Sequence, residues 1–143
     1  MTTKVICANP GNKLSQVLEF FTLYKIQHLP VMDNDKLVGI ISVNDIVHFL
    51  HKHLQNEPLN EAYFDEHFGL EDLMTKNPFT MEPNDELDKA INVLAEGKFQ
   101  AIPITLDGVL KGIITNKDIV KSFNKEPAED SNFFNIETPG FGV

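Results

Sequence analysis

The chain contains one pattern twice: residues 1–50 recur at residues 74–123, displaced by 73 positions without a gap. Of the 50 aligned pairs, 14 are identical, whereas unrelated sequences of ordinary composition would share roughly three. The strongest stretch aligns Gly39–Val47 with Gly112–Val120. Because a copy of this length buries too little apolar surface to be stable alone, the two copies are expected to share one core.

Each copy is predicted to fold as strand, helix, strand, turn, strand and helix, which indicates an α/β (α+β) protein. The first helix is indicated by apolar residues at i, i+3, i+4 and i+7. The predicted elements of the first copy are a strand at Val5–Cys7, a helix through Leu14, Val17, Leu18 and Phe21, a hairpin of Leu29–Met32 with Leu37–Ser42, and a closing helix at 43–55. The closing helix of the second copy is predicted at 116–124.

The repeat predicts four segments: the first copy at 1–55, a linker with one or two short helices at 56–73, the second copy at 74–124, and a tail at 125–143. The tail is rich in proline and acidic residues, a composition typical of disorder. It also carries Phe133, Phe134, Ile136 and Phe141. These side chains are expected to dock on the rest of the chain or on a neighbouring chain.

Charge and composition exclude several classes of function. The net charge is −9, and all 12 basic residues are lysines, so a nucleic-acid partner is not expected. No apolar run is long enough for a membrane span or a signal peptide. The single cysteine, Cys7, cannot form an internal disulfide, which fits a cytoplasmic location. As a small residue in a strand, Cys7 is also typical of a buried core position.

One motif occurs twice where a buried strand leads into a helix: glycine, two apolar residues, serine or threonine, any two residues, and aspartate. The hydroxyl of Ser42 or Thr115 would lie at the positive end of the helix dipole, where phosphate binds well. The carboxylate of Asp45 or Asp118 could accept hydrogen bonds from both hydroxyls of a ribose. Ser-x-x-Asp and Thr-x-x-Asp are equally typical of capping boxes, which only satisfy backbone N–H groups of the helix. Both interpretations remain open.

The doubled unit resembles the CBS domain pair, or Bateman module. The resemblance is carried by Leu29-Pro30-Val31 and Ile102-Pro103-Ile104, by the two motif endings, and by Met74-Thr75-Lys76-Asn77-Pro78 at the opening of the second copy. It covers residues 1–123 and implies two CBS repeats related by pseudo-twofold symmetry. It also implies binding of adenosyl ligands such as AMP, ADP, ATP or adenosylmethionine.

The resemblance further implies a role for particular residues. Asp45 and Asp118 would hold ribose, and Ser42 and Thr115 would face phosphate. The residues that would border the base are His28, Leu29, Ala101 and Ile102, with Thr80 for one cleft and Ile6 and Cys7 for the other. Family members often use arginine near phosphate, and this chain has none, which disfavours a triphosphate. Lys117 makes the Asp118 cleft the preferred anion site, whereas Asn44 at the same position favours an empty cleft or an uncharged ligand beside Asp45.

Other candidate sites are weaker. His48, His51 and His53 lie on one helix but offer at most two metal ligands on one face, so no metal site is predicted. No catalytic motif is present, and the chain is not expected to be an enzyme. Surplus apolar residues on the first copy, such as Phe20, Leu23, Tyr24, Phe49 and Leu50, indicate an interface. In the family such surfaces commonly form a twofold homodimer.

The sequence therefore predicts a stand-alone regulatory module that binds an AMP-like adenosyl ligand and signals to an effector protein. The alternative is a ligand-free dimerisation or docking module in which both motifs act only as helix caps.

Overall fold

The computed structural model describes residues 5–53 and 60–123. It divides the chain into two compact units, one of residues 6–78 and one that contains residues 79–123. We call them the first and second units and describe each by itself. Predictions that concern residues 1–4, 54–59 and 124–143 lie outside the described residues.

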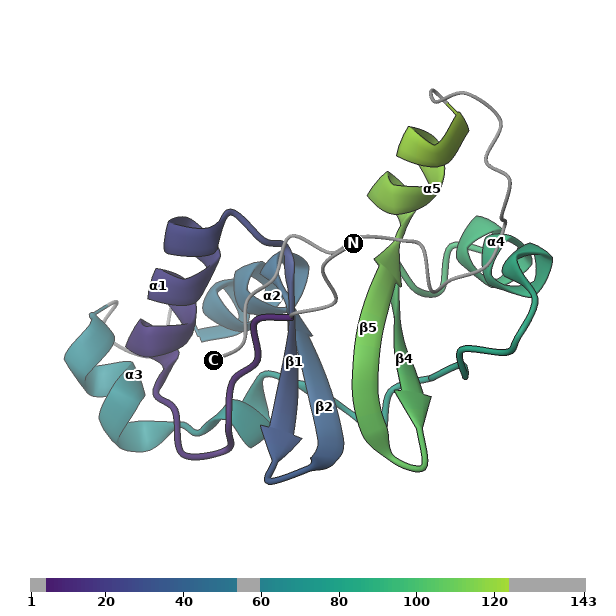
Figure 1. The fold of residues 1–143 in the computed structure, drawn as a ribbon. Coiled ribbons are helices and arrows are strands. Elements are labelled where there is room, and N and C mark those ends of the chain that lie inside the picture. Colours follow the sequence, from purple (N-terminus) through teal and green to yellow (C-terminus); the bar gives the residue numbers. More distant parts are fainter. Residues whose placement is uncertain (1–4, 54–59, 124–143) are drawn as a thin grey trace. The chain divides into compact units, whose positions relative to one another are not determined.

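The first unit contains a three-stranded antiparallel sheet and helices that pack on it (Figure 1). Its sheet has the order β1-β2-β3. The elements are α1 (Leu14–Tyr24), β1 (His28–Asp33), β2 (Lys36–Ser42), α2 (Val43–His53), α3 (Glu61–His67), a short 3-10 helix η1 (Leu70–Asp72) and β3 (Thr75–Lys76). The linker, predicted to hold one or two short helices, contains α3 and η1.

The second unit repeats the hairpin and its two helices. It contains α4 (Leu87–Ala95), β4 (Ala101–Leu106), β5 (Val109–Thr115) and α5 (Asn116–Phe123). β4 and β5 form a two-stranded antiparallel sheet. Gly97 follows α4 with a φ of 81°, a left-handed conformation in which glycine avoids a Cβ clash.

The two hairpins agree in register, as the 73-residue displacement predicts. His28 pairs with Ser42 as Ala101 pairs with Thr115. Both hairpins carry an irregularity at the same place, between Val31 and Met32 and at the aligned positions of the second copy. The predicted hairpins are confirmed. The predicted strand at Val5–Cys7 is wrong: the chain there forms only a single parallel bridge, from Ala8 to Val31.

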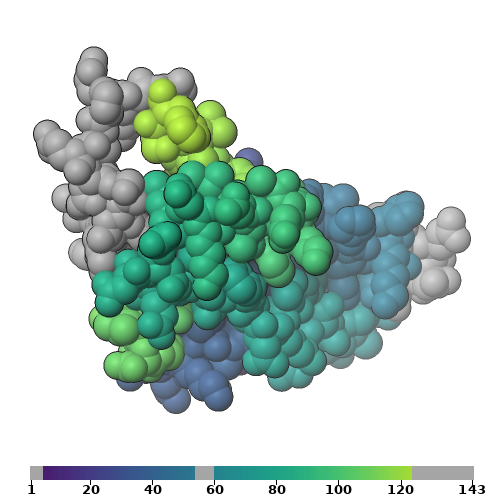
Figure 2. Space-filling model, turned by 90° about the vertical axis from the view of Figure 1, so that its right-hand side faces the viewer, coloured from purple at the N-terminus to yellow at the C-terminus, as the bar shows by residue number. Residues whose placement is uncertain are grey.

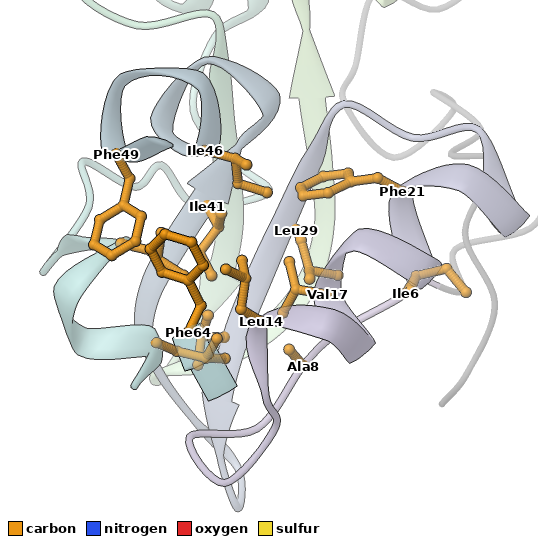
Figure 3. Close-up of a cluster of buried hydrophobic side chains, with 13 residues drawn as sticks. Ile6, Ala8, Leu14, Val17, Phe21, Leu29, Ile41, Ile46, Phe49 and Phe64 are labelled. Carbon is orange, nitrogen blue, oxygen red and sulfur yellow. The ribbon is translucent and has the colours of Figure 1, made fainter. Parts of the chain in front are cut away.

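The core of the first unit lies between the sheet and its helices (Figure 3). The predicted helix stripe supplies Leu14, Val17 and Phe21, which are all buried. The buried side chains of this core are Ile6, Ala8, Leu14, Val17, Phe21, Leu29, Val31, Ile41, Ile46, Phe49, Phe64, Leu70 and Leu73. The linker helices therefore contribute to the same core as the first repeat.

Helix α3 closes this core from the linker side. Phe64 of α3 is 2% exposed and lies edge-on to Phe49 of α2, with ring centroids 5.8 Å apart. Asp65 accepts hydrogen bonds from the backbone N–H and the hydroxyl of Ser15, at 2.9 and 2.5 Å, and so caps the start of α1. The interpretation of Phe49 as surplus surface is therefore wrong, because α3 covers it.

The second unit has a smaller core. Its buried cluster contains Met81, Ala90, Leu94, Ile102, Ile104 and Ile114. No residue of α5 is buried, and Val120 and Phe123 are 61% and 75% exposed. Figure 2 shows α5, coloured yellow-green, projecting from the surface of this unit. Within the described residues, no helix has the length and hydrophobicity needed to cross a membrane.

Candidate functional site

Both predicted motifs lie where a strand runs directly into a helix. β2 ends at Ser42 and α2 begins at the next residue. In the same way, β5 ends at Thr115 and α5 begins at Asn116. The hydroxyl and the carboxylate of each motif are therefore brought to the N-terminal turn of a helix, where backbone N–H groups lack partners within the helix.

Each motif forms a reciprocal pair of hydrogen bonds. The backbone N–H of Ser42 donates to Oδ2 of Asp45 at 2.8 Å, and the N–H of Asp45 donates to the Ser42 hydroxyl oxygen at 3.0 Å. Thr115 and Asp118 form the same two bonds, at 3.0 and 3.2 Å. Both motifs are therefore capping boxes, as one of the two interpretations predicts.

These bonds do not use the whole hydrogen-bonding capacity of either pair. Each carboxylate accepts through Oδ2, and among the described residues no bond to Oδ1 is recorded. Each hydroxyl accepts an N–H, which leaves its own hydrogen available to donate. Asp45 and Asp118 are also only half-buried. The capping role is therefore compatible with a ligand that bonds to Oδ1 of the aspartate and to the hydroxyl hydrogen.

His28 lies beside the first motif. It opens β1 and pairs with Ser42 across the hairpin. Burial lowers the pKa of His28, and the negative charge of Asp45 opposes this shift without reversing it. A lowered pKa favours a neutral imidazole near pH 7, which can donate or accept one hydrogen bond at each ring nitrogen.

The second motif has different neighbours. Ala101 takes the place of His28 and pairs with Thr115. Burial raises the pKa of Asp118, while its hydrogen bonds with Thr115 and the charges of Lys121 and Lys117 act in the opposite direction. Lys117 is the nearby cation that the motif predicts, whereas Lys121 is a second one that was not predicted. Its position three residues after Asp118 on a helix was the available signal, because such residues share a face.

The remaining predicted site residues are distributed over both units. Leu29, Ile102 and Ile6 are each 1% exposed or less, so only their backbone atoms could border a ligand. Cys7 precedes the bridge between Ala8 and Val31 in the first unit. Thr80 is half-buried in the second unit, just before the bridge that Met81 forms.

The two motif glycines differ in their surroundings. A Cβ atom on Gly39 would collide with Sδ of Met74 and lie 3.1 Å from the carbonyl oxygen of Thr75. A Cβ on Gly112 would meet no atom of the described residues within 4 Å. The Met74 side chain therefore fills the space beside Gly39, whereas the space beside Gly112 is open among the described residues.

The histidines of α2 do not form a metal site. In the part of the chain that the structure describes, no group of three or more His, Cys, Asp or Glu residues is arranged to hold a metal ion. His48 and His51 are exposed. His53 instead packs against Phe49 and Phe68, with ring centroids 4.5 and 4.7 Å apart.

The thiol of Cys7 is expected to react slowly in the folded protein. Burial raises its pKa from 9.0 to about 11. Since the thiolate is the reactive form, folding should slow alkylation at pH 8 by roughly 100-fold, the effect of two pKa units. The measurement is the rate of iodoacetamide labelling by mass spectrometry, with and without urea. A folded rate within threefold of the unfolded rate would contradict this prediction.

The same shift affects stability at alkaline pH. The folded state retains the thiol proton more strongly than the unfolded state, so the contribution of the Cys7 thiol to the free energy of unfolding is complete below pH 9. It is lost as pH rises through about 11. Cys7→Ser should reduce this part of the alkaline loss of stability.

Comparison with known proteins identifies the repeat. The sequence profile described as "CBS domain" matches residues 1–52 and 70–125. Protein MJ1225 of Methanocaldococcus jannaschii is 30% identical over 129 residues, which span 86% of this chain and 45% of that protein. Its crystal structure superposes with a TM-score of 0.74. Inosine-5'-monophosphate dehydrogenases of several organisms also match, over 20–23% of their length. The chain thus spans less than half the length of these relatives.

Two further structures are similar over nearly their whole length. CBSX2, crystallised in complex with AMP, is 29% identical, with a TM-score of 0.69 and coverage of 84% of this chain and 87% of that one. The CBS domain pair of protein MJ0100, in complex with 5'-methylthioadenosine and S-adenosyl-L-methionine, is 25% identical, with a TM-score of 0.70 and coverage of 87% and 91%. The profile match to both copies and these neighbours agree with the repeat seen in the hairpins, and the chain therefore belongs to the CBS domain family, as a pair of CBS repeats.

Proposed function

We propose that this chain is a regulatory module that binds an adenosyl ligand, most favourably an AMP-like one, and transmits its binding to an effector protein. The observation that carries the proposal is the doubled hydroxyl–carboxylate pair, in which the capping bonds of each carboxylate use Oδ2 and, among the described residues, no bond to Oδ1 occurs. The adenosyl ligands in the CBSX2 and MJ0100 structures support this choice of ligand class.

The second motif suits a ribose with a single phosphate group. Oδ1 of Asp118 would accept hydrogen bonds from ribose hydroxyls, and the hydroxyl of Thr115 would donate to a phosphate oxygen. The positive end of α5 with Lys117 and Lys121 would add favourable charge. Because the chain has no arginine to bind phosphates in a bidentate manner, AMP is expected to bind more tightly than ADP or ATP.

The first motif suits a less charged ligand. At the positions of Lys117 and Lys121 it carries Asn44 and His48, and His28 lies beside it with a lowered pKa. Fewer positive charges near Asp45 favour adenosine-like or methylthioadenosine-like molecules over phosphates. The two motifs are therefore proposed to differ in ligand preference.

Calorimetric titration of the nucleotide-free protein tests the proposal. AMP, ADP, ATP, adenosine, methylthioadenosine and adenosylmethionine should be compared at equal ionic strength. At least one of them should bind with micromolar to millimolar affinity, and AMP should bind more tightly than ATP. The absence of heat and of any thermal shift with all six at millimolar concentration would refute ligand binding.

Substitution of Asp118 is expected to separate ligand binding from capping. Asp118→Asn keeps an oxygen for the Thr115 N–H but loses the negative charge, so AMP affinity should fall about 10- to 100-fold. Stability should change little. Asp118→Ala also removes the cap, and it should lower the free energy of unfolding by a further ~0.5–2 kcal/mol. Affinity is measured by calorimetry and stability by urea denaturation.

The matched control is Asp45→Asn in the first motif. It should leave AMP affinity at the second motif within about twofold, because Asp45 belongs to the first hydroxyl–carboxylate pair and not to the pair that would bind AMP. If Asp118→Asn binds AMP as the unchanged protein does, Asp118 does not hold the ribose.

The capping bonds favour one alternative, a ligand-free dimerisation or docking module. In that case Asp118→Ala would lower stability, and no variant would change any nucleotide response. A homodimer and an effector protein remain proposals in both cases, and sedimentation velocity of the purified chain tests the first of them.

A further inference from the structure

A histidine lies beside the first hydroxyl–carboxylate pair, and the second pair has no such neighbour. His28 opens β1 and is the direct partner of Ser42 across the hairpin. Directly paired residues of an antiparallel hairpin share one face of the sheet, with Cβ atoms about 4.5–5.5 Å apart. The imidazole therefore lies next to the Ser42 side chain. At the aligned position of the second unit, Ala101 pairs with Thr115 and has no polar side-chain atom.

The carboxylate of Asp45 belongs to the same cluster. Its two capping bonds with Ser42, at 2.8 and 3.0 Å, hold it at the first turn of α2. The negative charge of Asp45 acts on the His28 ring, where it opposes the effect of burial on the pKa. A ligand that bonds to Oδ1 of Asp45 or to the Ser42 hydroxyl would therefore come within electrostatic reach of the imidazole.

The two motifs differ in the kind of positive charge that surrounds them. Lys117 and Lys121 act on Asp118 in the second motif, and lysine keeps its charge throughout the neutral range. The first motif carries Asn44 and His48 at these two positions. Histidine gains and loses its charge between pH 5 and 8, or about that range. The positive charge near the first motif therefore varies with pH, whereas that near the second motif does not.

The segments around β1 carry other titratable groups. Lys36 of β2 lies at the opposite end of the hairpin, where it pairs with Asp33. His48 of α2 is exposed, so solvent and salt screen its charge. Among the described residues, Asp45 is the charged group that acts on the pKa of His28. The remaining titratable residues of α1, its two ends, α2 and the segment before α1 are Cys7, Lys13, Glu19, Tyr24, Lys25, His51, Lys52 and His53.

We propose that the charge of His28 determines which adenosyl ligand the first motif binds. The neutral ring suits a ligand without phosphate, such as adenosine. The protonated ring donates from both nitrogens and attracts phosphate, so a phosphate-bearing ligand such as AMP binds there together with a proton. The second motif, which has lysines and Ala101, binds the same ligand without this proton. The inference rests on the proposed function and adds a proton-linked choice of ligand to it.

The direction of the effect follows from burial and charge. Burial lowers the pKa of His28, which favours the neutral ring in the ligand-free protein near pH 7. A phosphate beside the ring would raise this pKa, because an opposite charge favours the charged form. By linkage, protonation must increase the affinity for the phosphate by the same factor. AMP affinity of the first motif should therefore rise as pH falls, whereas adenosine affinity should not.

Calorimetric titration of the full chain at about pH 8 and about pH 5.5 tests the inference. Asp118→Asn leaves the first motif intact, and Asp45→Asn leaves the second motif intact. At the lower pH, AMP affinity of Asp118→Asn should rise about 10-fold relative to that of Asp45→Asn, the effect of one hydrogen bond to a charged group. The ratio cancels the second ionisation of AMP itself, near pH 6 or about that value. Adenosine affinity should stay within about twofold.

Three further variants, made in the Asp118→Asn chain, assign the rise to His28. His28→Gln keeps a polar side chain that cannot gain a charge, so it should abolish the rise. His28→Lys is charged at both pH values and should bind AMP equally well at both. His48→Gln is the matched control, because His48 is exposed on the same helix as Asp45, and it should leave the rise within about twofold. A rise that survives His28→Gln or disappears in His48→Gln would overturn the proposal.

NMR titration follows the ring itself. The His28 signal, assigned by its absence from His28→Gln, should titrate with a pKa below the 6.5 of an unperturbed histidine. AMP should raise this pKa, and adenosine should not. An unchanged pKa in Asp118→Asn saturated with AMP would overturn this inference and leave the proposed function intact. If neither motif binds any of the six adenosyl ligands, the proposed function fails, and this inference fails with it.

Discussion

Replacing Phe64 with alanine is expected to lower the free energy of unfolding of the first unit by about 3–5 kcal/mol. Phe64 is 2% exposed and lies among Phe49, Tyr63 and Phe68. Its removal would leave a cavity beneath α3 and deprive three aromatic rings of a packing partner. Urea denaturation measures the effect.

Tyrosine fluorescence makes this measurement specific. The chain has no tryptophan and two tyrosines, Tyr24 and Tyr63, which both lie in the first unit. Leu23→Ala is the control, because this side chain is 66% exposed. Its loss should lower the free energy of unfolding by less than about 1 kcal/mol. A loss below about 1 kcal/mol for Phe64→Ala would mean that the linker helix is not part of the core.

The two hairpins and the helices that flank them were predictable because each of them occurs in both copies of the repeat, so two stretches of sequence indicate the same element. A hairpin with turn residues at Asn34-Asp35 is a modest signal alone, but Asp107-Gly108 stands at the aligned place. Both turns contain residues with positive φ, at Asn34, Asp107 and Gly108, which suits two-residue hairpin loops. The turn residues thus indicate the register of each hairpin, and the same turn position in the second copy supports it.

The cover of α2 was not predictable in the same way. Phe49 has the polar residue Ser122 as its counterpart, and this asymmetry was interpreted as exposed surface. What buries Phe49 is a tertiary contact with α3, and amphipathic periodicity does not say which later segment will meet a given face. The capping role of Asp65 could not be predicted for the same reason, because its hydrogen-bond partner Ser15 lies 50 residues earlier in the chain.

The sequence predicted the hydroxyl–carboxylate motifs of the candidate site, but it did not predict which side chains surround them. The hydroxyl–carboxylate spacing implied a helix start, and both capping boxes have that geometry. Lys121 and the Met74 contact of Gly39 depend on side-chain directions and on strand pairing between β2 and β3. Neither can be derived from spacing within the motif.

Gly39→Val is expected to destabilise the first unit by about 3 kcal/mol, the upper range for overpacking a core. Gly39 lies in the central strand β2 and pairs with Val31 on one side and Lys76 on the other. A Cβ there would collide with the side chain of Met74, 2.9 Å from its Cγ, and approach the Thr75 carbonyl at 3.1 Å. Urea denaturation followed by tyrosine fluorescence measures the loss.

Gly112→Val is the matched control, since the aligned glycine has open space among the described residues. Its effect on stability should stay within about 1 kcal/mol, because valine suits a strand and reduces the freedom of the unfolded chain. Equal losses for the two variants would show that the glycines serve backbone conformation rather than room for a neighbour.

Met74→Ala should partly rescue Gly39→Val, because it removes both Sδ and Cγ and leaves only the Thr75 carbonyl in the way. Recovery of about half the lost stability is expected, as for other contacting pairs in which a second change relieves the first. If no recovery occurs, the backbone of β3 rather than the methionine side chain fixes glycine at this position. The distance between β2 and β3 would then be the constraint that makes Gly39 irreplaceable in the first repeat and Gly112 replaceable in the second.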